Sequence, residues 1–166
     1  MSPREGVVQR MGVNGEDQLL NPIFRLRLAT AALDGAVCTE RYIPFPYCQV
    51  WDVISDLERE LPRIVTTMRS FRVIASDGHT MQVLATSVLG FKAQFDVRLS
   101  NGCLLMQSRF IAIGAVADPH GQGTQLMVAC WLWRPGKLRA RAALSPLVGS
   151  RSRALIQRLN RRLRLG

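Results

Sequence analysis

The sequence predicts an α+β fold: one strand and two short helices, then an antiparallel meander that brings the sheet to about six to seven strands, and finally a long C-terminal helix. From residue 80 to residue 134, apolar and polar residues alternate in short segments, which is typical of β-strands. Turn pairs such as Asp77-Gly78 and Asn101-Gly102 separate these segments and indicate hairpins. After residue 145 the apolar residues recur every three or four positions, as on one face of a helix.

The length and composition suit one folded domain. The chain has 166 residues, of which 48% are hydrophobic and 20% charged, which is enough apolar material for a buried core. The longest apolar run, residues 126–133, is far shorter than the roughly twenty residues that a helix needs to cross a bilayer. Residues 1–18 carry charges and no long apolar block, which does not resemble a secretory signal. We therefore expect a cytoplasmic protein without a membrane span.

Residues 1–35 differ from the rest of the chain. They are poor in aromatic residues and contain one plausible helix, residues 22–33, which Asn21 and Pro22 would start. One side of this helix would carry Ile23, Leu26 and Ala29 or Thr30. We expect an N-terminal extension over residues 1–35, partly disordered or carrying this short helix, and one folded domain over residues 36–166.

Residues 37–43 alternate in a β-branched run that ends at Pro44, which predicts a strand. The next apolar residues step by four, three and four positions, as on one face of a helix: Val50, Ile54, Leu57 and Leu61. Pro62 would close this segment. Asp56 would cap a second helix at its start, because its short side chain accepts hydrogen bonds from free backbone amides.

Three later strands differ in how many faces they bury. Residues 92–99 place four apolar side chains inward: Ala93, Phe95, Val97 and Leu99. Residues 104–110 place Leu104, Met106, Ser108 and Phe110 inward, with Gln107 and Arg109 outward. Residues 124–134 are apolar on both faces, so we expect this strand to be covered on both sides.

The last segment predicts a long helix. Ser145 is a good cap and Pro146 a favoured first residue. An apolar stripe follows, formed by Leu147, Val148, Leu155, Leu159 and Leu163. A helix from Pro146 to Leu163 would be about 27 Å long, enough to lie across a curved sheet.

The net charge of +10 is unevenly distributed. Residues 1–118 contain twelve basic and twelve acidic residues, whereas residues 119–166 contain ten basic residues and no carboxylate. Most are arginines, whose guanidinium groups match phosphate. A surface for anionic membrane or nucleic acid is one interpretation, and a merely solvated helix face is the other. The candidate contact residues are Arg151, Arg153, Arg158, Arg161, Arg162 and Arg164.

Motif spacing assigns no catalytic or metal site. The cysteines, Cys38, Cys48, Cys103 and Cys130, lack CxxC or CxH spacing, so we expect buried thiols, no zinc site and no disulfide. His79 and His120 lie in predicted turns, where side chains are solvated. A GxSxG elbow and a Walker-type phosphate loop are both absent from the sequence. We expect no metal and no cofactor, and the catalytic residues stay unassigned.

Residues 43–56 resemble a known family. They read Ile-Pro-Phe-Pro-Tyr-Cys-Gln-Val-Trp-Asp-Val-Ile-Ser-Asp, which is similar to the opening of START-like proteins, the SRPBCC superfamily of polyketide cyclases/dehydrases and lipid-transport proteins. Residues 121–124, Gly-Gln-Gly-Thr, look like that family's Gly-Thr hairpin. The likeness covers residues 36–166. The basic last helix and the first 35 residues depart from it.

The resemblance implies the helix-grip fold, in which a curved antiparallel sheet wraps around the C-terminal helix. A cavity between them would hold a lipid, polyketide, quinone or similar ligand, which makes residues 36–166 a START-like ligand-binding domain. The candidate lining residues are Val83, Ala85, Ser87, Phe95, Val97, Met106, Ser108, Phe110, Leu126, Val128, Leu155 and Leu159. A filled core would need the same apolar stripe, so that alternative stays open.

Three functions are carried forward. The leading hypothesis is a non-catalytic binder or carrier of a hydrophobic small molecule, peripheral to an anionic membrane through its basic helix. The alternatives are an aromatase/cyclase-like enzyme and a regulatory protein whose basic helix contacts anionic membrane or nucleic acid. Nucleic acid is less favoured because no aromatic residue follows Trp133 to stack on bases. A homodimer stays open, since exposure of Trp131 and Trp133 would indicate a dimer or membrane contact.

Overall fold

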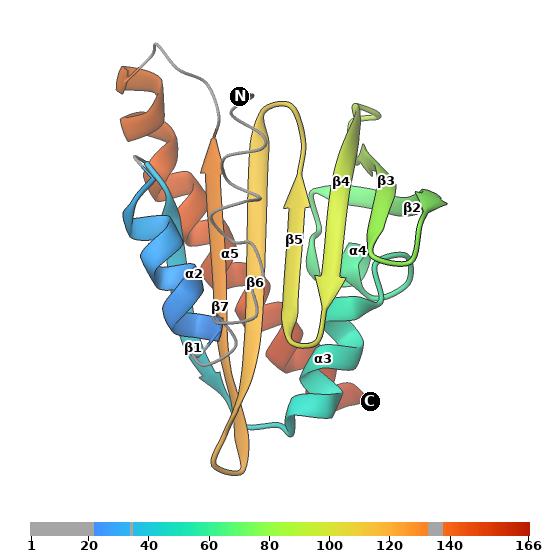
Figure 1. Cartoon of the computed structure of the whole chain (residues 1–166), viewed down its shortest axis with the longest axis vertical. Coiled ribbons are helices and arrows are strands. Elements are labelled where there is room, and N and C mark those ends of the chain that lie inside the picture. Colours follow the sequence, from blue (N-terminus) through green and yellow to red (C-terminus); the bar gives the residue numbers. More distant parts are fainter. Residues whose placement is uncertain (1–21, 34, 133–137) are drawn as a thin grey trace.

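A seven-stranded antiparallel sheet in the order β1-β7-β6-β5-β4-β3-β2 forms the centre of the protein (Figure 1). The computed structural model describes residues 22–33, 35–132 and 138–166, with the backbone alone for residues 132 and 138–150. The strands are β1 (Val37–Ile43), β2 (Met68–Ser76), β3 (Thr80–Ser87), β4 (Lys92–Ser100), β5 (Cys103–Gln107), β6 (Ile111–His120) and β7 (Gly123–Leu132). The chain's first strand therefore joins the far end of the meander by pairing with β7.

The helices lie on both faces of the sheet. α5 (Leu138–Leu165) crosses one face, which it shares with α3 (Tyr47–Ser55) and α4 (Leu61–Ile64) (Figure 1). α2 (Pro22–Ala31) packs on the other face, against β6 and β7. A curved antiparallel sheet, short helices after the first strand and a long C-terminal helix confirm the predicted α+β helix-grip fold. In the part of the chain that the structure describes, no helix is long and apolar enough to cross a membrane.

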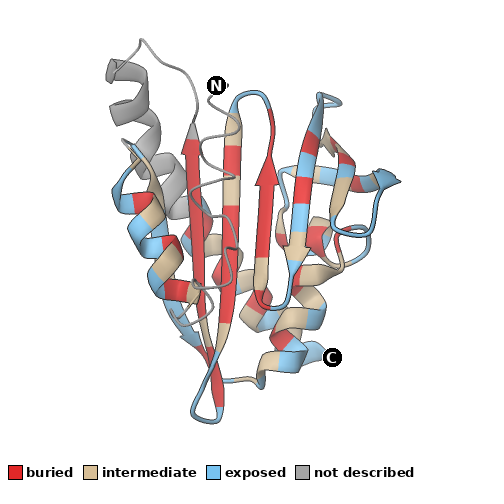
Figure 2. Ribbon diagram, viewed as in Figure 1, coloured by how far each residue is buried: buried red, intermediate tan, exposed pale blue. Residues whose placement is uncertain are grey.

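β7 is buried on both faces, as predicted (Figure 2). Leu126 and Val128 belong to the cluster beneath α5, which we call the inner cluster. The alternate residues belong to an outer cluster shared with α2: Met127, Ala129 and Trp131, against Ile23 and Leu26. Trp131 is therefore covered by the protein itself, and Trp133 lies outside the described residues.

The two predicted short helices are present, but with different ends. Asp56 follows α3, and its carboxylate accepts a hydrogen bond from the Arg59 amide at 3.0 Å, within a turn that precedes α4. Pro62 lies in the first turn of α4, where the missing N–H would have no helical partner, and so does not close the segment. Asp56 suits a turn as well as a helix start, and Pro62 suits the first turn of a helix as well as the position after its end.

The last helix begins earlier than predicted. It starts at Leu138, so that Ser145 and Pro146 lie inside it. The seven residues before Ser145, Leu-Arg-Ala-Arg-Ala-Ala-Leu, are all strong helix formers. Their combined preference outweighs the local cost of the proline, which removes one backbone donor.

The predicted hairpin turns are confirmed by glycines with positive φ, among them Gly78 and Gly90. Gly102 has φ 76°, and a Cβ there would lie 2.7 Å from the backbone oxygen of Ala117, so a larger residue would be strained and crowded. The turn expected at Asp118-Pro119 is instead part of β6, which continues to His120 before the chain turns.

The structure supplies a test of α2. Leu26 is 2% exposed in the outer cluster, whereas Leu28 on the same helix is 53% exposed. We expect Leu26→Ala to lower the free energy of unfolding by about 2–4 kcal/mol, because it leaves a cavity, and Leu28→Ala to change it little. Urea denaturation measures both. Equal, small effects would mean that α2 is not part of the cooperative fold.

Candidate functional site

The inner cluster lies between the sheet and α5 and contains most of the predicted lining residues. Eight of them are buried in it: Val83, Ala85, Phe95, Val97, Met106, Leu126, Val128 and Leu159. Leu155 is partly buried against the same cluster. The strand patterns therefore placed these eight side chains correctly on one face, but Ala93 of β4, which was also predicted to point inward, is exposed.

The residues of α5 that face the sheet differ in part from the predicted leucine stripe. Among residues 151–165, the part of α5 whose side chains the structure describes, Ser152, Ile156 and Leu159 are buried, while Leu155 and Leu163 are half-buried. Sequence reasoning missed Ser152 and Ile156. The steps of four and three residues between them and Leu159 are the helical signal that could have found them.

The short helices supply a further wall that sequence reasoning did not assign to the site. The buried residues of the two helices and of the turn between them, all in the inner cluster, are Val50, Ile54, Leu57, Leu61 and Ile64, of which Leu57 lies in the turn. The helical spacing had already placed four of these residues on one face. The spacing did not reveal that α3 and α4 lie on the same side of the sheet as α5, and so it did not connect these residues with the site.

Ser87 has a structural partner in place of the expected ligand. Its hydroxyl accepts a hydrogen bond from the Phe91 amide at 3.0 Å, and its backbone N–H donates to the Phe91 carbonyl at 2.8 Å. Ser87 ends β3, so these bonds close the β3–β4 turn. Its predicted role in orienting a ligand has no support from this geometry.

Ser108 and Phe110 lie beyond the end of β5, which stops at Gln107. Ser108 is buried, but its hydroxyl is used within the loop. It accepts a hydrogen bond from the Ile111 amide and donates one to the Ile111 carbonyl, both at 3.2 Å, and these bonds close the β5–β6 loop. Phe110 is 56% exposed, so it does not line the interior. The alternation that placed it inward fails because the strand ends three residues earlier.

At the end of the sheet opposite these loops, the polar side chains Thr124 and Tyr47 are hydrogen-bonded within the protein. The Thr124 hydroxyl donates to the Phe45 carbonyl at 2.8 Å, which ties the start of β7 to the segment before α3. Tyr47 stacks on Trp51 and its hydroxyl donates to Asn101 Oδ1 at 3.1 Å. Burial, and to a smaller extent the charge of Asp118, raises the pKa of Tyr47, so its phenol stays neutral at physiological pH.

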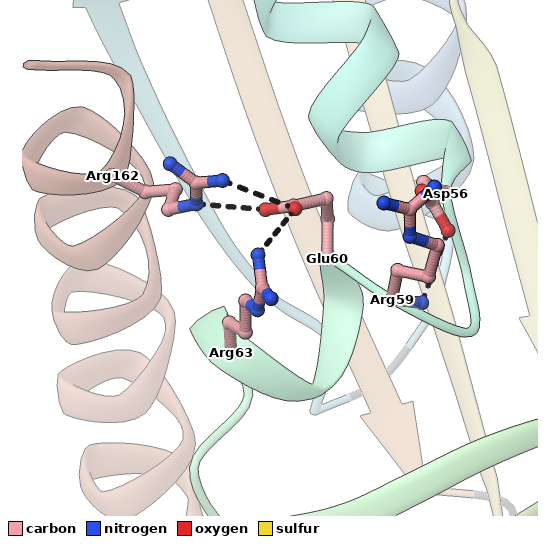
Figure 3. A network of polar contacts seen from close by, with 5 residues as sticks. All are labelled: Asp56, Arg59, Glu60, Arg63 and Arg162. Carbon is pink, nitrogen blue, oxygen red and sulfur yellow. Dashed lines mark hydrogen bonds and ion pairs between the residues drawn. The ribbon is translucent and has the colours of Figure 1, made fainter. Parts of the chain in front are cut away.

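Two of the six predicted anion-contact arginines are engaged with the protein. Arg162 donates two hydrogen bonds to the Glu60 carboxylate, at 2.9 and 3.2 Å, and Arg63 donates a third at 2.7 Å (Figure 3). Arg158 donates to the backbone oxygen of Ile64 at 3.4 Å. These contacts hold α5 against the α4 segment. The exposed arginines of the set are Arg151, Arg153, Arg161 and Arg164.

The Glu60 contacts have an electrostatic consequence. Hydrogen bonds from Arg162, with the charges of neighbouring arginines, hold the pKa of Glu60 below its ordinary value of 4.5. A lowered native pKa stabilises the fold above the unfolded pKa, and the contribution is lost as the pH falls through the native pKa. The Glu60–Arg162 pair therefore adds stability at neutral pH.

Two polar hollows lie on the outer side of the sheet. One, of about 490 Å³, is lined by Gln82, Lys92, Ala93, Gln94, Asp96, Gln107, Ser108, Arg109 and Phe110. It lies where β4 extends past β5, because their pairing begins only at Asp96 and Gln107. Gln107 was predicted to face water, but it is 4% exposed and its Oε1 has no hydrogen-bond partner.

The second hollow, of about 300 Å³, separates α2 from the ends of β1, β6 and β7. Glu40 lines it, and pairs with Arg27 of α2 and with Gln125 of β7. These hydrogen bonds, that of Arg27 first, lower the pKa of Glu40. The hollow's polar groups therefore fix α2 to the sheet.

The residues that could bind metals do not gather. Within residues 22–33, 35–132 and 138–166, no three His, Cys, Asp or Glu side chains lie together as a metal site would require. The expectation of four buried thiols is wrong, since Cys38 and Cys48 are exposed. Burial raises the pKa of the Cys130 thiol to about 11, which keeps it protonated and unreactive. His120 is an exposed strand residue whose ring meets Tyr42 edge-on.

Comparison with known proteins identifies the fold. No family model and no curated protein matches the sequence, but solved structures match it. A Thermus thermophilus protein aligns with a TM-score of 0.61 at 20% identity, over 77% of this chain and 96% of that one. A START superfamily protein from Mycobacterium smegmatis aligns with a TM-score of 0.60 at 16% identity, over 78% and 97%. The chain has a START-like fold.

One of the structures with a similar fold is that of an enzyme. The Zhui aromatase/cyclase from a Streptomyces species aligns with a TM-score of 0.62 at 15% identity, over 78% of this chain and 93% of that one. At such identities the likeness establishes the START-like fold alone. It supports the resemblance that residues 43–56 and 121–124 suggested.

The Glu60–Arg162 pair can be tested by pH. We expect Glu60→Gln to lower the free energy of unfolding at pH 7 by about 0.5–1 kcal/mol. The difference from the native protein should narrow as the pH falls below 4.5, because Glu60 of the unfolded chain then binds a proton first, and it should be lost once the pH passes the lowered native pKa. Asp52→Asn, at an exposed position of α3, is the matched control. A pH-independent loss would contradict the assigned charge interaction.

Proposed function

We propose that this START-like protein binds a hydrophobic small molecule between the sheet and α5. The observation that carries the proposal is the burial of apolar side chains from β3, β4, β5, β7, α3, α4 and α5 on one side of the sheet. The buried polar side chains on that side, among the described residues, are Thr124, which bonds the Phe45 carbonyl, and Ser152. Such a lining favours a ligand held by apolar contact, with few polar groups to orient it.

The same chemistry favours binding over catalysis. General acid–base catalysis requires a titratable group within hydrogen-bond reach of the substrate. Tyr47 packs against the inner cluster at its rim, and its hydroxyl already donates a hydrogen bond to Asn101. The supporting geometry is therefore that of a carrier, with the ligand class spanning lipids, polyketides and quinones.

The first experiment is native mass spectrometry of the freshly purified protein, followed by solvent extraction. We expect a bound apolar molecule whose mass accounts for the excess over the bare chain. If the bare mass is found, titration with a panel of lipids, quinones and a fluorescent apolar probe follows. Failure of the whole panel to bind would reject the proposal.

A substitution distinguishes a ligand cavity from a filled core. Ala85 is 0% exposed in the inner cluster. If the interior holds a ligand, Ala85→Phe should occupy its space, abolish probe binding and leave stability nearly unchanged. If the cluster is already filled, overpacking should lower the free energy of unfolding by about 1–3 kcal/mol. Ala75→Phe, at an exposed position of β2, controls for the added ring.

A second candidate is an aromatase/cyclase-like activity. The structural match to the Zhui aromatase/cyclase favours keeping it. In that case the interior would shape a poly-ketone chain for ring closure without a metal or nucleotide. Omission of the protein from a reconstituted pathway should then change the distribution of cyclised products, and an unchanged distribution would exclude it.

A further inference from the structure

Exposed apolar side chains gather at one end of the sheet. Nine large hydrophobic residues are exposed in the described part of the chain, and four of them lie in two neighbouring loops. Leu89 and Phe91 of the β3–β4 turn are 80% and 73% exposed, and Val88 beside them is 51% exposed. Phe110 of the β5–β6 loop is 56% exposed. We call residues 88–91 and 108–110 the two apolar loops.

The two apolar loops lie at the same end of the meander. β3 and β5 both run toward this end, and β4 and β6 both run away from it, because each strand is antiparallel to the next. The loops also share a hollow, since Lys92 at the base of the first and Arg109 and Phe110 of the second line it together. Figure 1 places both turns at the upper end of the sheet.

The first loop is held with its apolar side chains outward. Its backbone is fixed by the bonds to Ser87 described above, by the Gly90 amide on the Ser87 carbonyl at 3.0 Å, and by the Val88 amide on the Thr67 carbonyl at 3.1 Å. Gly90 has φ 85°, a conformation that glycine adopts without strain. A turn this well bonded could have presented polar residues at no structural cost, yet it presents Leu89 and Phe91.

The second loop is built in the same way. The Ser108 hydroxyl accepts from the amides of Phe110 and Ile111, at 3.4 and 3.2 Å, which leaves the Phe110 ring directed outward. The guanidinium of Arg109 lies over this ring, 5.5 Å from its centroid. The loop therefore presents an aromatic ring and a cation together.

The charges around the loops have one sign. Residues 66–69, 87–92 and 108–111 contain Arg69, Lys92 and Arg109 and no Asp or Glu. All three cations are exposed. Asp96 lines the hollow but lies on the body of β4, four residues past Lys92. Protruding apolar residues ringed by cations match a bilayer, whose apolar interior lies beneath anionic headgroups.

We propose that the two apolar loops dock this protein on an anionic lipid bilayer, with Leu89, Phe91 and Phe110 entering the headgroup–acyl boundary and Lys92 and Arg109 contacting lipid phosphates. This assigns the membrane contact to the loop end of the sheet, where sequence reasoning had placed it on α5. The inference does not depend on the proposed interior ligand. A flat protein partner fits less well, because the two loops are separate protrusions with a hollow between them.

The test is flotation of the full chain with vesicles of phosphatidylcholine containing phosphatidylglycerol, and with phosphatidylcholine alone. We expect binding to the anionic vesicles, and a loss of about tenfold or more in the Leu89→Ser/Phe91→Ser variant because two large apolar side chains no longer enter the bilayer. Phe110→Ser should lose less. Lys92→Ala/Arg109→Ala should weaken binding to anionic vesicles and leave the neutral ones unchanged.

Two controls separate the loops from other surfaces. Ile74→Ser removes a 48% exposed apolar residue near the opposite end of β2 and should leave binding unchanged. Arg153→Ala/Arg161→Ala removes charge from the exposed side of α5 and should have a smaller effect than the loop variants. In Phe91→Trp, added vesicles containing brominated acyl chains should quench emission beyond that of the native tryptophans.

The proposal is overturned if the loop variants float as the native chain does, or if the α5 variant alone loses binding. It is also overturned if the native chain ignores vesicles and self-associates through these loops, seen as a smaller sedimentation coefficient of Leu89→Ser/Phe91→Ser. Binding of an apolar probe in solution, measured on the same variants, reports the interior site separately. A loss of vesicle binding with retained probe binding supports the docking role.

Discussion

The burial of β7 on both faces is the constraint on which the rest of the arrangement depends. A strand whose successive residues are all apolar is stable only if each face finds its own cover. Leu126 and Val128 require α5 on one side, and Met127 and Trp131 require α2 on the other. The ladders to β1 and β6 satisfy its backbone. A single sheet layer thus holds two separate clusters of buried side chains apart.

Polar contacts then fix the positions of the helices against the sheet and against one another. Thr124, at the start of β7, bonds the chain just before α3, and Glu60, just before α4, bonds Arg162 of α5. Each contact joins segments far apart in the sequence, and each involves a half-buried or buried group whose loss of water must be compensated. Part of the arginine content of the last helix therefore serves internal packing. Among the described side chains of the helix, Arg151, Arg153, Arg161 and Arg164 stay exposed to solvent.

Local patterns predicted the elements well and their ends poorly. Alternation in β4 identified its buried face, and the unbroken apolar run of β7 predicted its burial on both faces. The same alternation misplaced Phe110, since nothing local marks β5 as ending at Gln107. Ser145 and Pro146 resembled a helix start, but the good helix formers before them prevailed. The contacts of Arg158 and Arg162, and the cover over Gln107, depend on tertiary neighbours that no spacing in the sequence records.

The order of the elements along the chain has a consequence for synthesis. β1 is made early, yet its partner β7 comes about ninety residues later, as the pairing of Val37 with Cys130 shows. α5 follows every described strand, and its residues Ile156 and Leu159 are buried in the inner cluster. While the chain grows from its N-terminus, α3 and α4 are made before the meander and can cover only part of its apolar face, and the part beneath α5 has no cover until this helix leaves the ribosome. Closure of this side of the fold therefore waits for α5, whose contacts with β1 join distant parts of the chain, the kind of contact that slows folding.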